Sequence, residues 1–142
     1  MLADLPIGEP VPCRVGSLEE DLDLHAALVP NPVCTFYMRV SGNGLREHGI
    51  HDGDLMVIDR SVEPRSGHVV VVAHQGSFLL RPLRRQGDQW LLEPLRPAEA
   101  AIPLDMERFD RSGLFGVVVH AVHHLNKRTA NNRGKLKNPE PD

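Results

Sequence analysis

Histidine is the residue type that stands out for chemistry, because the chain has eight of them and an imidazole can ligate a metal or transfer a proton. His120, His123 and His124 lie close together near the end of an apolar segment. In a strand, side chains alternate, so His120 and His124 would share one face about 13 Å apart while His123 points the other way. Zinc ligands must converge to about 2 Å from the ion, and no Cys-x-x-Cys or His-Glu-x-x-His pattern is present. We therefore expect no metal site and no cofactor, with these histidines facing solvent or a strand edge.

A loop between two predicted strands is the second place where chemistry is expected. The stretch from Arg39 to Ser61, RVSGNGLREHGIHDGDLMVIDRS, predicts a strand, a turn, a short irregular segment and a tight Asp52-Gly53 turn into the next strand. Its shape suits the presentation of one reactive side chain, yet the position expected to carry it holds Gly44. No Gly-x-Ser-x-Gly is present and no predicted helix follows these glycines, so neither a hydrolase elbow nor a phosphate-binding loop is indicated.

The composition is that of one ordinary globular domain. The 142 residues are 41% apolar and 25% charged. No apolar run approaches the roughly 20 residues that span a bilayer, and the start MLADLPIGEP lacks the basic and apolar regions of a signal peptide. We therefore expect a cytoplasmic protein with no membrane contact, in which Cys13 and Cys34 stay unpaired. A net charge of -3 does not indicate a general nucleic-acid binder.

A short helix is predicted ahead of the strands. Ser17-Leu18-Glu19-Glu20 matches a capping box, in which the serine and the last glutamate cap the first turn. Pro30 and Pro32 would end this helix. The side chains expected to face a core are Leu22, Leu24, Ala27 and Leu28.

The rest of the chain predicts strands. Aromatic and β-branched residues, with turns roughly every 8–12 residues, indicate five or six strands and little helix. The segment 54–60 alternates like a half-buried strand, 67–74 is apolar enough for a fully buried one, and Pro82 argues for an edge or a bulge. We therefore expect a mainly β fold of compact twisted antiparallel sheets. The predicted strands span residues 34–40, 54–60, 67–74, 77–85, 89–95 and 113–125.

Several spaced segments together resemble the LexA/UmuD-type self-cleaving serine peptidases. S-G-N-G-L followed by G-I-H-D-G-D-L-M-V-I-D is similar to that family's catalytic loop, where Ser-Gly-x-Ser-Met precedes Gly-Ile-x-Asp-Gly-Asp and an apolar strand. Residues 22–40 resemble the helix and strand that lead into the loop in UmuD, 66–83 the hairpin with the family's lysine, and 115–122 the last strand. The resemblance covers about residues 18–125 and implies the C-terminal peptidase-domain fold with one short N-terminal helix.

The resemblance places both catalytic positions at residues that cannot perform the chemistry. The family uses a serine whose proton is taken by a neutral, desolvated lysine. Here the serine position is Gly44, which has no nucleophile, and the lysine position is Arg81, whose guanidinium stays protonated at any working pH. We therefore expect no peptidase activity. The loop would persist because Gly44 tolerates backbone angles that a side chain would not.

Two questions about this site stay open in the sequence. Ser41 is an alternative nucleophile, although its ordinary role is that of a turn residue. Arg81 either lies buried beside a carboxylate or carbonyl groups, or points outward with Arg84 and Arg85.

The family's self-cleavage bond has its equivalent in the N-terminal arm. Alignment through Leu18–Leu24 places that bond at Ile7-Gly8 or Gly8-Glu9. Few residues precede it, so the chain resembles a family member that has already been processed. Removal of residues 1–8 is expected to leave partner binding unchanged, and cleavage here in trans by an active paralogue stays open.

By resemblance, the expected function is that of a catalytically inactive UmuD-like homodimer that regulates a Y-family translesion polymerase in the SOS DNA-damage response. The recombinase filament, and an active paralogue in a heterodimer, are further implied partners. Alternatives are a self-cleaving peptidase that uses other residues, and a repressor-type dimerisation module. A repressor needs a helix-turn-helix domain, for which too few residues precede Ser17. The family dimerises through its C-terminal β region, so the interface expected on an exposed final strand comprises Phe115, Val117, Val119 and Ala121.

The chain is thus expected to have three regions. Residues 1–16 form an extended arm, 17–125 the peptidase-fold domain and 126–142 a basic disordered tail. A solvated tail is the ordinary interpretation of that last region, and a weak phosphate-binding arm is the alternative.

Overall fold

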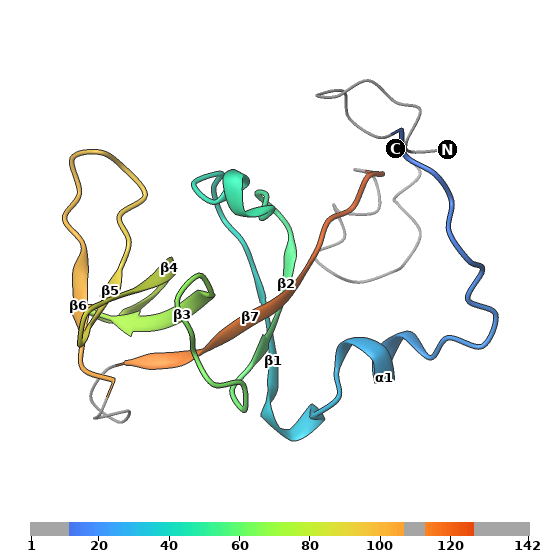
Figure 1. Ribbon diagram of the computed structural model, residues 1–142, viewed down its shortest axis with the longest axis horizontal. Coiled ribbons are helices and arrows are strands. Elements are labelled where there is room, and N and C mark those ends of the chain that lie inside the picture. Colours follow the sequence, from blue (N-terminus) through green and yellow to red (C-terminus); the bar gives the residue numbers. More distant parts are fainter. Residues whose placement is uncertain (1–11, 107–112, 127–142) are drawn as a thin grey trace, which may run out of the picture.

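The computed structural model describes residues 12–106 and 113–126, and these residues form seven antiparallel strands with little helix. The order of the strands across the sheet is β1-β2-β7-β3-β4-β5-β6 (Figure 1). The predicted mainly β fold is confirmed, and β6 is the strand that was not predicted. The strands are β1 (Thr35–Arg39), β2 (Leu55–Asp59), β3 (Val69–His74), β4 (Ser77–Gln86), β5 (Gln89–Leu92), β6 (Ile102–Leu104) and β7 (Leu114–Val122).

The last strand, β7, runs through the middle of the sheet, between β2 and β3 (Figure 1). β2 and β3 follow each other in sequence, yet each pairs with β7 and not with the other. β3 pairs only with residues 114–117 of β7, so residues 118–122 have a neighbouring strand on one side only, and the expectation that the final strand offers free edge amides stays a prediction for that part. The two strands at the edges of this order are β1 and β6.

The strand β4 pairs with two different partners along its length. Its first half forms the predicted hairpin with β3, closed by Gln75 and Gly76, whose φ angles of 49° and 82° suit a tight hairpin turn. Its second half pairs with β5. Pro82 is the last β4 residue opposite β3, and β5 pairs with β4 only from Leu83 onward, so the missing amide falls where β4 changes partners and one of its sides has no strand.

Two apolar clusters lie on opposite faces of the central strands. Val71 belongs to the first cluster and its neighbours Val70 and Val72 to the second, as the alternation of side chains along a strand requires. In β2, the residues from Met56 to Asp59 are all buried, so the prediction of a half-buried strand is wrong. Val57 and Asp59 on one face are buried, as are Met56 and Ile58 on the other.

The N-terminal helix α1 (Leu24–Leu28) is shorter than predicted and begins later. Its N-cap is Asp23, whose side chain accepts a hydrogen bond from the Ala26 amide at 3.2 Å, so the capping box at Ser17–Glu20 is wrong. The helix buries none of its own side chains, although Val29, just after it, is in the core. Within residues 12–106 and 113–126, no helix is long and apolar enough to cross a membrane. The predicted tail from Lys127 onward, and residues 1–11 of the predicted arm, lie outside the described residues.

Candidate functional site

A pocket of about 290 Å³ lies where the loop after β1 meets β4. Gly44 and Arg81, the two positions singled out in the sequence, both line it. Ser41 lines it as well, and Leu95, from the connection between β5 and β6, forms another part of the wall. Most of the remaining lining is apolar. The structure therefore brings together three residues that the sequence predicted to share one site.

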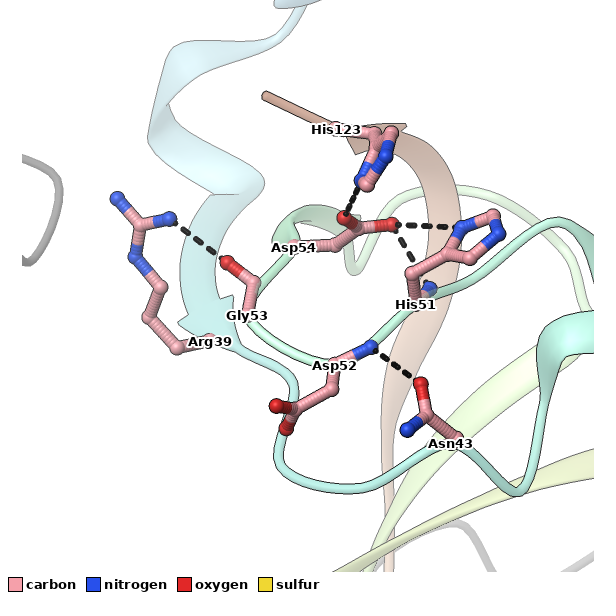
Figure 2. Close-up of polar contacts among 7 residues, drawn as sticks. All are labelled: Arg39, Asn43, His51, Asp52, Gly53, Asp54 and His123. Carbon is pink, nitrogen blue, oxygen red and sulfur yellow. Dashed lines mark hydrogen bonds and ion pairs between the residues drawn. The ribbon is translucent and has the colours of Figure 1, made fainter. Parts of the chain in front are cut away.

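The loop that carries Gly44 is held by a small set of polar contacts. The Asp52 carboxylate accepts a hydrogen bond from the Gly42 amide at 2.7 Å, and the Asp52 amide donates to the Asn43 side chain at 3.2 Å (Figure 2). Gly42 has a φ of +100°, a conformation that favours glycine. The predicted Asp52-Gly53 turn is confirmed, with Gly53 at a φ of +85° and its amide bonded to the Val40 carbonyl.

Gly44 itself does not need to be glycine for its backbone conformation. It is absent from the glycines with positive φ, so the expectation that its backbone angles exclude a side chain is wrong. A Cβ atom placed on Gly44 would lie 3.1 Å from the Cδ1 atom of Leu95, the flexible end of that side chain. A shift of Leu95 by a few tenths of an ångström would make room for it.

Arg81 points into a partly buried environment with partners of its own. Its side chain is 17% exposed, one Nη atom donates to the Leu80 carbonyl at 3.1 Å, and the other lies 3.4 Å from the Glu99 carboxylate. The sequence left open whether Arg81 lies buried beside a carboxylate or carbonyl groups, or points outward. The structure supports the first alternative. Arg84 pairs instead with Glu93.

Comparison with known proteins gives this arrangement its context. The profile of the Peptidase S24-like family matches residues 5–119, and it includes the loop with Gly44 and the hairpin with Arg81. The chain belongs to the Peptidase S24-like family. The resemblance to LexA/UmuD-type proteins is thereby confirmed.

Named relatives agree with this assignment. Protein SamA of Salmonella typhimurium is 34% identical over 119 residues, which are 83% of this chain and 79% of SamA. Protein MucA of Escherichia coli is 32% identical over 126 residues, or 85% of this chain and 81% of MucA. The LexA repressor of Methylococcus capsulatus is 40% identical over 73 residues, which are 51% of this chain and 36% of the repressor.

The S24-like pocket of this chain has no lysine in its lining. The lysines of the chain all lie at or after Lys127, outside the described residues. No histidine lines this pocket either, so Ser41 has no neutral nitrogen base among the described pocket residues. The pocket thus presents a glycine and an ion-paired guanidinium at the two positions that the family resemblance assigns to the nucleophile and the base.

One of the histidines predicted to face solvent or a strand edge has side-chain partners. His123, one residue past β7, lies 2.8 Å from the Asp54 carboxylate through its Nδ1 atom and stacks on His51 (Figure 2). These partners were not predicted because His51 and Asp54 lie far from the segment 120–124 along the chain. The available signal was the His-x-x-Asp spacing of His51 and Asp54 in a predicted tight turn. His120 is half-buried on β7, opposite Val57.

Proposed function

We propose that this protein is a catalytically inactive, UmuD-like member of the S24-like family. In this proposal it is a dimeric regulatory subunit of a Y-family translesion polymerase in the SOS DNA-damage response and acts in the cytoplasm. The observation that carries the proposal is that Gly44 and Arg81 line one pocket. Family membership and the similarity to SamA and MucA support its regulatory part.

The chemical argument for inactivity has two independent parts. Gly44 offers no hydroxyl, so no acyl-enzyme can form at that position. Arg81 stays charged at any working pH, and its guanidinium lies 3.4 Å from the Glu99 carboxylate. Either change alone is sufficient to stop a serine–lysine mechanism. The family's cleavage-bond equivalent at Ile7, Gly8 and Glu9 lies outside the described residues, and in the proposal it stays uncut by this chain.

The dimer in this proposal uses an aromatic cluster on the face that carries the pocket. We define this cluster as Phe36, Phe78 and Phe115, whose rings meet edge to face with Phe115 in the middle at 5.2 and 5.4 Å. The Arg60 guanidinium lies 4.6 Å from the Phe115 ring. Phe36 and Phe78 are 41% and 55% exposed, so the cluster presents apolar surface to solvent.

Of the residues expected at the dimer interface, Phe115 fits this surface best. Val117 is buried in the core and cannot reach a partner without rearrangement, whereas Val119 and Ala121 are half-buried. The proposed interface therefore keeps the predicted strand, whose residues 118–122 have a strand partner on one side only, and adds the aromatic side chains beside it.

A Phe36→Ser/Phe78→Ser double variant should weaken the dimer. Buried aromatic residues dominate interface energetics, so we expect the dimer dissociation constant to rise more than about tenfold. Light scattering across a protein concentration series measures this constant. Leu24→Ser, which removes a comparably exposed apolar side chain from α1, is the matched control and should leave the dimer unchanged. A natural protein that is monomeric at micromolar concentration would contradict the proposed dimer.

Partner binding tests the regulatory part of the proposal. The natural protein should co-purify with the catalytic subunit of a Y-family polymerase from the same cell, and a variant lacking residues 1–8 should bind it equally well. A large loss of binding on truncation would contradict the proposal of a chain that needs no processing. Binding to the recombinase filament, or to an active paralogue, can be measured with the same pair of proteins. Association with a DNA-binding chain, without polymerase binding, would instead favour the repressor-type module.

A further inference from the structure

Two imidazoles and a carboxylate converge next to the pocket loop but outside the pocket itself (Figure 2). Asp54 is only 1% exposed, and its two oxygens lie 2.8 Å from Nδ1 of His123 and 3.7 Å from Nδ1 of His51. One ligand atom from each of the three side chains lies within 4.8 Å of the others. Nitrogen and carboxylate donors brought together in this way are the ligand set of many transition-metal sites.

The fold explains how these distant residues meet. Leu55 in β2 pairs with Val122 in β7, so the antiparallel register places the preceding residue, Asp54, opposite the following one, His123. His51 joins them locally, because the Asp54 amide donates to the His51 carbonyl at 3.0 Å and closes the turn between them. The cluster therefore rests on the long-range pairing of β2 with β7 together with one tight turn.

The ring of His51 carries an unusual feature. Its Nδ1 atom is buried, yet it makes no hydrogen bond within the described residues. Buried polar atoms nearly always have a partner. Here the atom faces a carboxylate oxygen that is too far away for a hydrogen bond, so the space between them is suited to a cation.

We propose that His51, Asp54 and His123 bind a divalent transition-metal ion of the zinc type. Bond lengths of about 2.0–2.1 Å in a tetrahedral site correspond to about 3.3–3.4 Å between ligand atoms. The observed separations of 2.8 and 3.7 Å, each to a different Asp54 oxygen, lie close to that range on either side. The side chains of His51 and His123 are 35% and 40% exposed, so solvent can reach a fourth coordination position. Magnesium and calcium prefer oxygen ligands and are excluded by the two imidazoles.

The surroundings of the carboxylate favour this role. The His51 amide donates to the second Asp54 oxygen at 2.9 Å and fixes the orientation of the carboxylate, as outer contacts do in metal sites. A bound ion would join the turn before β2 to the end of β7. Through Asp52, which bonds Gly42 and Asn43, it would also brace the loop that carries Gly44.

Calorimetric titration of the full chain with zinc chloride tests the proposal. We expect one equivalent of Zn²⁺ per chain, and an affinity reduced more than about tenfold in His123→Asn and in His51→Asn. The asparagine at position 123 retains a donor for Asp54, so this variant should fold. His124→Asn, which changes the neighbouring histidine, is the matched control and should bind like the natural protein. Zinc should also raise the melting temperature of the natural protein and of the control but not of the two cluster variants.

A second measurement keeps the outcome clear if a variant is poorly folded. Co²⁺ added to the natural protein should give the visible absorption of a four-coordinate site, and Zn²⁺ should displace it. An absence of zinc binding by the natural chain would overturn the proposal. Binding that is the same in His51→Asn, His123→Asn and the control would overturn it as well, because the ion would then be held by other histidines.

Discussion

A Gly44→Ser/Arg81→Lys double variant is expected to shed residues 1–7 or 1–8 on prolonged incubation at mildly alkaline pH, while the natural protein keeps its full mass. The substitutions restore a hydroxyl and a base that can lose its proton. The scaffold accepts the serine, since Gly44 has an ordinary backbone conformation and the nearest obstacle is the mobile end of Leu95. Intact mass spectrometry over time measures the result.

The Glu99 carboxylate should affect the rate of self-cleavage in the same experiment. A carboxylate close to the new lysine would hold it in the charged form and slow proton abstraction. Adding Glu99→Gln to the double variant should therefore speed self-cleavage, and this effect separates a lysine acting as a base from one acting only as a positive charge. Arg96 also pairs with Glu99 at 3.5 Å. Its side chain is too exposed for this pair to cancel the effect of the Glu99 carboxylate on the new lysine.

The single variants are the controls for this reactivation. Gly44→Ser alone lacks a base and Arg81→Lys alone lacks a nucleophile, so neither should be cut. If the natural protein loses its N-terminal residues, the inactive assignment fails, and Ser41→Ala then shows whether the serine that lines the pocket is responsible. If no combination is cut, the pocket has diverged beyond its two chemical positions.

Much of the fold was predictable because its strands are local patterns. The apolar run 67–74, the Gly76 turn and the Asp52-Gly53 turn each carry their signal within a few neighbouring residues. The structure confirms both turns and a strand at Val69–His74, although that strand is buried only at residues 70–72 and not throughout. β6 was missed because Ile102–Leu104 is too short to show alternation. The helix start was misplaced because Asp23 caps α1 closer to its apolar residues than Ser17.

The unpredicted parts of the site depend on pairing between distant segments. Nothing near Val122 in sequence indicates that β7 pairs with β2, and it is this pairing that brings His123 to Asp54. The partner of Arg81 is likewise Glu99, on the connection between β5 and β6. The family resemblance singled out Gly44 and Arg81, and both line one pocket, but their contacts required the structure.

The glycines of this chain should differ sharply in their tolerance of a side chain. Gly113→Ala is expected to lower the free energy of unfolding by about 3 kcal/mol, because strain at positive φ adds to crowding. Gly113 has a φ of +77°, and an added Cβ would clash with the backbone oxygen of Ala73, which cannot move aside like a side chain. Its own carbonyl accepts the Ala73 amide, so relief of the clash would break that bond. Urea unfolding measures the change.

Two matched variants separate strain from crowding. Gly87 has a φ of +63° but open space around its Cβ position, so Gly87→Ala should cost about 1 kcal/mol from strain alone. Gly44→Ala would introduce no backbone strain and would contact only Leu95. Its free energy of unfolding should stay within about 1 kcal/mol of that of the natural protein. A loss at Gly44 as large as that at Gly113 would mean that the fold itself demands glycine there. The expected small effect would mean that the missing nucleophile is not imposed by the backbone of the loop.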